Sequence, residues 1–177
     1  IMTRWLSAFA VVVFSQNFVA AHFVFVVPQK DGKTVEVVLS ETLEADDAVT
    51  VDKIAGLKLT ARTADGKETP IKLDAGKHTL TGKLEGKPVI AYGSVPYGVM
   101  KRGEGKPFLL QYLPKAVWGS NEKSATLGKS AALEIVPIFT DGKTVLLVLA
   151  AGEPVADAEI NVVLPGDKKE KVKTGKD

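Results

Sequence analysis

Short runs of β-branched and aromatic residues, separated by turn-forming dipeptides, constrain the fold of this chain more than any other feature. Glycine adopts the positive φ that a tight hairpin turn requires, so an Asp-Gly dipeptide between two apolar runs predicts antiparallel pairing. No segment has the periodicity of a long amphipathic helix. The pattern predicts an all-β fold, an antiparallel β-sandwich of the Ig-like type. The three dipeptides are Asp31-Gly32, Asp65-Gly66 and Asp141-Gly142.

The expected strands are short, rich in strand-forming residues, and bounded by glycine, proline or aspartate. They cover residues 23–27, 35–39, 57–61, 78–84, 89–92, 108–112, 133–139, 144–149 and 160–164. Residues 41–54 are the one stretch where a helical turn is expected. There, Asp46-Asp47 either caps a short helix or shapes a loop.

The first residues have the layout of a secretory signal peptide. Arg4 supplies the positive charge, residues 5–14 the apolar segment, and Val19-Ala20-Ala21 the small-residue cleavage site. Residues 1–21 are therefore expected to be removed, which makes His22 the first residue of an exported protein in the periplasm or at the cell surface. The alternative is an uncleaved membrane anchor, but polar residues 15–17 would lie inside such a span.

Composition excludes several classes of protein. The formal charge is +2 and the lysines are scattered among acidic residues, so nucleic acid is not an expected partner. The chain has no cysteine, which excludes disulfides and thiolate metal sites. It contains no metalloprotease, serine-hydrolase, phosphate-loop or dinucleotide-binding motif, so an enzyme is not expected.

The chain is expected to hold one complete domain and part of another. A polar, turn-forming stretch at residues 119–124 predicts a boundary, which gives a first domain over 22–130 and a second over 131–177. Two strands and part of a third cannot bury a sandwich core, so the second domain is expected to be cut short at Asp177.

Several segments resemble one bacterial family. They are residues 22–28 (HFVFVVP), 97–103 (YGVMKRG), 106–112 (KPFLLQY) and Lys115-Ala116. These are similar to the exported domain of unknown function 4198, also described as the periplasmic component of nickel and cobalt uptake. Residues 149–160 resemble the start of the Ig-like or transthyretin-like module that follows in that family. The resemblance implies a membrane permease as partner, and it covers essentially the whole mature chain.

Histidines are the candidate metal ligands. An N-terminal His22 would offer an α-amine and an imidazole, a chelate that suits Cu(II) or Ni(II). His78 completes a three-nitrogen site if its strand lies beside the first strand. Such a site is also what a copper oxygenase would require. Many members of the similar family carry a further histidine where this chain has Ser40-Glu41, and this departure weakens the nickel interpretation.

The other candidates have simpler explanations. Glu41 belongs to an acidic cluster with Glu44, Asp46 and Asp47 that offers oxygen ligands to a hard cation, but its spacing matches no calcium loop. A solvated acidic loop is the favoured interpretation. Two functions remain open: binding or uptake of nickel, cobalt or copper through His22, or a structural or adhesive surface module that binds protein or glycan without metal.

Overall fold

The computed structural model describes residues 22–119, 122–164, 166 and 168–176. Strands predominate in these ranges, and every pairing is antiparallel, so the predicted all-β class is confirmed. The strands are β1 (Phe23–Pro28), β2 (Thr34–Ser40), β3 (Lys58–Thr63), β4 (Glu68–Ile71), β5 (Leu73–Ala75), β6 (Thr79–Lys83), β7 (Pro88–Met100), β8 (Phe108–Tyr112), β9 (Lys115–Val117), β10 (Glu134–Thr140), β11 (Lys143–Ala150), β12 (Glu153–Pro154), β13 (Glu159–Val163) and β14 (Lys169–Lys173). The short helical segments are η1 (Asp52–Ile54), α1 (Glu122–Ala125) and η2 (Gly128–Ser130).

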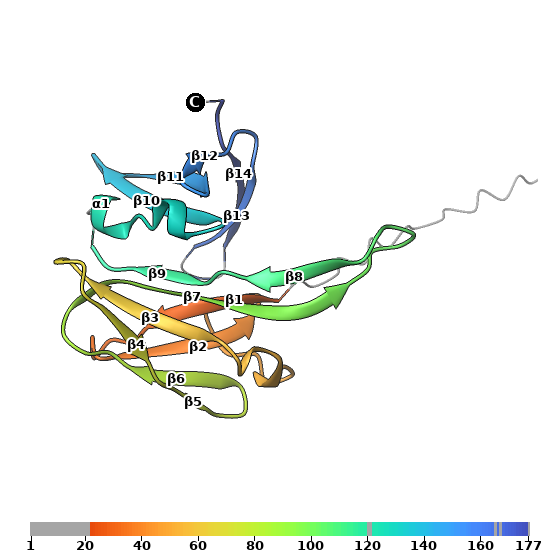
Figure 1. Ribbon diagram of the computed structural model, residues 1–177, viewed down its shortest axis with the longest axis horizontal. Helices are drawn as coiled ribbons and strands as arrows, with labels where there is room; N and C mark the ends of the chain where they lie inside the picture. Colours follow the sequence, from red (N-terminus) through yellow and green to blue (C-terminus); the bar gives the residue numbers. More distant parts are fainter. Residues whose placement is uncertain (1–21, 120–121, 165, 167, 177) are drawn as a thin grey trace, which may run out of the picture.

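Two sheets form the larger part of the fold (Figure 1). One has the order β1-β2-β6-β5; the other has the order β4-β3-β7-β8, with β9 also paired to β7. Alternate side chains of both sheets point into a common apolar core, as expected for strands with one buried face. The core includes Val24, Val35, Val37, Leu59 and Ala91.

All three Asp-Gly dipeptides lie at the expected hairpins. They connect β1 to β2, β3 to β4, and β10 to β11. Gly32, Gly66 and Gly142 have φ of 64°, 86° and 74°, values that glycine adopts without steric cost. At the third turn Asp141 also has a positive φ of 49°, which is the pattern of a type I′ turn.

Strand β7 is longer than the sequence suggested. Glycine and proline at positions 93–98 were expected to end it at residue 92, but it continues to Met100. It pairs with β3 and β9 over its first half and with β8 over its second half, with a register shift between Pro96 and Gly98. The shift accommodates proline, which cannot donate a ladder hydrogen bond.

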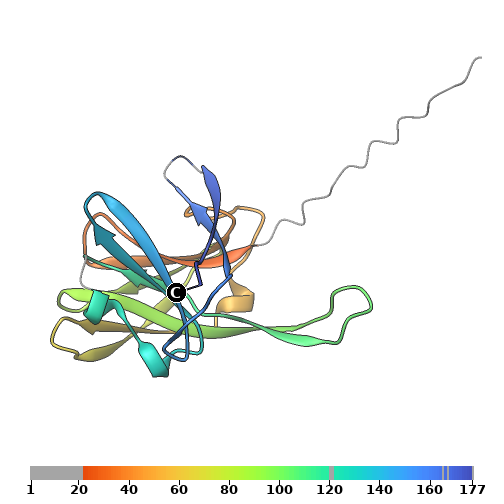
Figure 2. The ribbon, with the colours of Figure 1, turned by 90° about the horizontal axis from the view of Figure 1, so that it is seen from above.

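The last five strands form separate sheets, β10-β11-β12 and β13-β14. They follow α1 and η2 and lie over the outer side of β7 (Figures 1 and 2). A second apolar cluster joins the two parts through Ile90 of β7, Ala125 of α1, Val136 of β10 and Leu149 of β11. Residue 130, after which the sequence predicts a domain boundary, is the last residue of η2, and the boundary stays a prediction.

No helix in the described ranges is long and apolar enough to cross a bilayer. The predicted signal segment, residues 1–21, lies outside these ranges.

Candidate metal site at the start of the first strand

His22 immediately precedes β1 and contacts the loop that follows β2. Its side chain is 31 % exposed, and its Nε2 lies 3.2 Å from Oδ2 of Asp46. The hydroxyl of Tyr112, on β8, donates a hydrogen bond of 2.9 Å to the His22 carbonyl oxygen. Both the backbone and the imidazole of His22 are therefore held by side chains far away in the sequence.

Asp46 is a fixed anionic partner for this imidazole. Its Oδ1 accepts a hydrogen bond of 2.8 Å from the Ala48 backbone N–H. That bond, the hydrogen bond from His22, and the nearby charges of His22 and His78 lower the pKa of the Asp46 carboxyl. The carboxylate is ionised at neutral pH, so it favours a proton on Nε2 and leaves Nδ1 as the nitrogen that can bind a metal.

His78 lies at the same end of the sheet but in a separate position. Its Nδ1 donates to the Val49 carbonyl oxygen at 2.8 Å, on the same loop that carries Asp46. The two histidines precede β1 and β6, and β2 lies between these strands. Two strand spacings place their backbones about 10 Å apart. The three-nitrogen site was expected to form if the strand that begins at His78 lies beside the first strand, but β6 is separated from β1 by β2, so this condition is not met.

Glu41 is engaged elsewhere. Its Oε2 accepts a hydrogen bond of 3.0 Å from Lys169 Nζ on β14. Among the residues that the structure describes, no group of three or more His, Cys, Asp and Glu side chains is arranged to hold a metal ion. Any metal bound here would depend on the chelate of one histidine and on the groups next to it.

The sequence did not identify Asp46 as the partner of His22. It placed Asp46 in an acidic loop of residues 41–47, which lies 24 positions after His22 in the sequence, and no motif links the two residues. The pairing arises because the β1–β2 register sets Phe23 opposite Ser40, so the loop begins beside His22. Only the strand register could have revealed it.

A buried ion pair lies at the junction of the two parts. Lys115 Nζ lies 2.5 Å from Oε2 of Glu134, and the side chains are 8 % and 2 % exposed. Glu134 also accepts hydrogen bonds from the backbone N–H groups of Leu127 and Gly128, at 3.0 and 2.7 Å. Through these contacts Glu134 on β10 is linked to β9 and to the start of η2, so we assign the ion pair a structural role.

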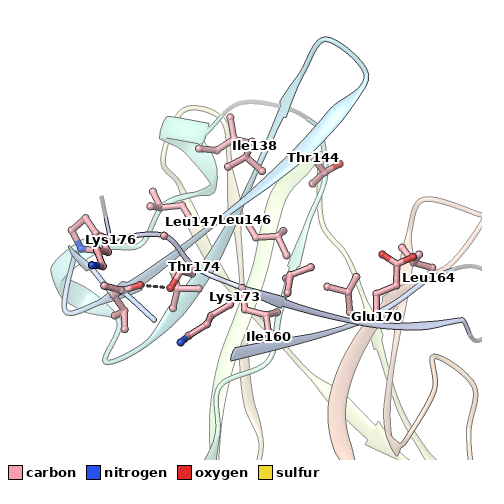
Figure 3. Close-up of a pocket in the computed structure, with 18 residues that line it drawn as sticks. Ile138, Thr144, Leu146, Leu147, Ile160, Leu164, Glu170, Lys173, Thr174 and Lys176 are labelled. Atoms are coloured by element: carbon pink, nitrogen blue, oxygen red, sulfur yellow. Dashed lines mark hydrogen bonds between the residues drawn. The ribbon is translucent and has the colours of Figure 1, made fainter. Parts of the chain in front are cut away.

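An apolar groove of about 680 Å³ lies between the β10–β11 and β13–β14 hairpins. Figure 3 shows side chains of both hairpins around it, including Ile138, Leu146 and Ile160. At one end Thr174 Oγ1 donates to the Val155 carbonyl oxygen at 2.7 Å. The volume is typical of pockets that bind ligands, and its lining favours an apolar group.

The fold and this site define a class: an antiparallel all-β protein with a histidine–aspartate pair at the start of its first strand. A scan against protein-family models found no match, and searches of curated proteins and of solved structures found none either. The resemblance to the exported uptake family therefore stays a prediction.

Proposed function

We propose that this is an exported, non-enzymatic protein that binds a transition metal, copper, nickel or cobalt, through His22 and assists its uptake. The observation that supports the proposal is the contact between His22 Nε2 and the Asp46 carboxylate. A carboxylate on the far nitrogen of a metal-binding imidazole fixes the ring and raises its basicity.

The chemistry requires cleavage after Ala21. The freed α-amine and Nδ1 of His22 then close a six-membered ring on the metal, and Asp46 orients the imidazole from its other side. Nitrogen donors in a tetragonal arrangement suit Cu(II) and Ni(II). The Val49 carbonyl likewise orients His78, whose Nε2 is a further donor if the loop of residues 41–51 moves.

Uptake implies delivery to a membrane permease. This partner is proposed from the family resemblance, and the described surface contains no feature that identifies its docking site. The proposal of metal binding does not depend on it.

Calorimetric titration with Cu(II) and Ni(II) tests the proposal. The protein should be prepared with His22 at its amino terminus, beside a variant with one extra alanine ahead of His22. We expect stoichiometric binding that the extra alanine abolishes. Asp46→Asn should weaken binding about 10- to 100-fold, and Asp47→Asn, an exposed neighbour, serves as the matched control.

The pH dependence is a second readout. An α-amine has a reference pKa of about 7.7–8.0 and must lose its proton to bind, so the apparent affinity should fall about tenfold per pH unit below that range. Heats equal to those of the alanine-extended variant at all pH values would refute the metal proposal.

The second candidate is a surface module that binds another protein without metal. The apolar groove between the β10–β11 and β13–β14 hairpins favours it, since this lining fits apolar side chains better than a glycan. Substituting Leu146 by Ser should then weaken partner binding and leave metal titration unchanged.

A further inference from the structure

The end of the β7–β8 hairpin projects beyond the rest of the described chain in two perpendicular views (Figures 1 and 2). Four apolar side chains near its end are exposed: Val99 by 72 %, Leu109 by 60 %, Met100 by 40 % and Phe108 by 39 %. Exposing several large apolar groups together is unfavourable in water, so such a patch marks a contact surface.

These side chains occupy both faces of the hairpin. Val99 pairs with Leu109, and Met100 pairs with Phe108. Successive residues of a strand point to opposite faces, so one pair lies on each side. A flat protein surface would cover only one of these pairs, whereas the interfacial zone of a bilayer surrounds an inserted hairpin on all sides.

The connecting loop, residues 101–107, is basic. It carries Lys101, Arg102 and Lys106 against Glu104, so three positive charges and one negative charge leave a net charge of +2. The Arg102 guanidinium lies over the Phe108 ring, 5.8 Å from its centroid. Basic side chains next to exposed apolar ones are the composition of segments that bind anionic membrane surfaces.

We propose that this hairpin end, residues 99–109, inserts into the headgroup region of a bilayer that contains anionic lipid. The two paired positions of each strand and the loop extend on the order of 10 Å, which matches the depth that interfacial elements reach. The occupant is the lipid surface: the apolar pairs enter it and the basic groups contact the headgroup phosphates.

The proposal of membrane insertion does not depend on metal binding, but the hairpin and the candidate metal site are linked through β8. Tyr112, at the other end of β8, hydrogen-bonds to the His22 carbonyl oxygen. Tyr112 lies four positions after Phe108, about 13 Å along a strand. Insertion of the hairpin end would therefore hold the His22 region close to the membrane surface.

Vesicle co-sedimentation tests the proposal. The protein, expressed from its full sequence and purified after export, is mixed with vesicles of phosphatidylcholine alone or with phosphatidylglycerol. We expect binding that rises with the anionic fraction. Val99→Ser with Leu109→Ser should lower partitioning at least about tenfold, while Val145→Ser, at a similarly exposed site on β11, should not.

Charge variants separate the basic contribution. The triple change Lys101→Gln, Arg102→Gln and Lys106→Gln should weaken binding about fivefold per charge removed, and less so at high salt. Its matched control is Lys30→Gln, Lys33→Gln and Lys87→Gln, which removes three exposed charges elsewhere. Equal losses in both triple variants would indicate a general charge effect and overturn the assignment to the hairpin.

Insertion itself can be measured because the chain has no cysteine. An environment-sensitive fluorophore on Glu104→Cys should shift its emission to the blue on vesicles, whereas the same label on Glu85→Cys, in an exposed loop, should not. No binding to any vesicle, or no shift at position 104, would overturn the proposal and direct the search to a protein partner.

Discussion

Replacing Glu134 by glutamine removes the negative charge from the junction between the two parts of the chain. The carboxylate is 2 % exposed and lies 2.5 Å from Lys115 Nζ. Glutamine keeps the shape and still accepts hydrogen bonds from the Leu127 and Gly128 backbone N–H groups. The variant therefore isolates the charge, and it leaves the Lys115 ammonium buried without its counterion.

The expected loss of stability in Glu134→Gln follows from the burial of the ion pair. Removing one partner of a buried ion pair costs about 3–5 kcal/mol. Lys115 is 8 % exposed, so partial access to water favours the lower end, about 3 kcal/mol. For a chain of this size that corresponds to a fall in melting temperature of roughly 6–12 °C. Lys115→Met removes the other partner of the ion pair. It should lower the free energy of unfolding by less, about 1–2 kcal/mol, because two backbone N–H groups still stabilise the Glu134 carboxylate.

The pH dependence of the free energy of unfolding gives a second test of the same ion pair. Burial raises the pKa of Glu134, but hydrogen bonds from Lys115, Leu127 and Gly128 outweigh it and hold the pKa below the ordinary 4.5. A depressed pKa means that the charge contributes stability above about 4.5, and that this contribution is lost as pH falls through the folded-state pKa. The difference between wild type and Glu134→Gln should be full at pH 7 and shrink in acid.

Urea unfolding followed by circular dichroism at pH 7 and at pH 3 measures both effects. Glu153→Gln, on the exposed strand β12, is the matched control and should change the free energy of unfolding by less than about 0.5 kcal/mol. A loss below 1 kcal/mol for Glu134→Gln at pH 7, or a difference from wild type that does not change with pH, would refute the reasoning.

Two further substitutions test the packing. Ile90 is fully buried where β7 packs against the β10–β11 hairpin, and Ile90→Ala should lower the free energy of unfolding by about 2–5 kcal/mol. A loss under 1 kcal/mol in urea unfolding would show that this contact contributes little. Gly93→Ala would place a Cβ 2.2 Å from the Lys58 carbonyl oxygen and should cost roughly 1–3 kcal/mol. Gly56→Ala, which meets nothing within 4 Å, should be neutral by the same measurement.

The candidate site was only partly predictable. His22 was identified because the signal-peptide pattern would expose its amine, which is local information. Its partner Asp46 was not identified, because the contact depends on the turn and loop that follow β2. The same limit applies to His78: its strand was predicted, but the sheet order that places β2 beside it was not.

The sequence by itself determined the secondary-structure class and the hairpins. Asp-Gly turns and β-branched runs act over a few residues, so the antiparallel connections at Gly32, Gly66 and Gly142 follow from local backbone preferences. Even β8 was predicted with its observed bounds, Phe108–Tyr112.

Only the tertiary structure decided which segments meet. The length of β7, the order β1-β2-β6-β5 and the burial of Glu134 against Lys115 depend on contacts between residues distant in the chain. The exposure of the hairpin end at Val99 and Leu109 is the same kind of property, since an apolar strand residue is buried or exposed according to what packs against it. Local backbone preferences determine which segments form strands, whereas burial of their side chains against residues distant in the sequence determines which strands lie next to each other.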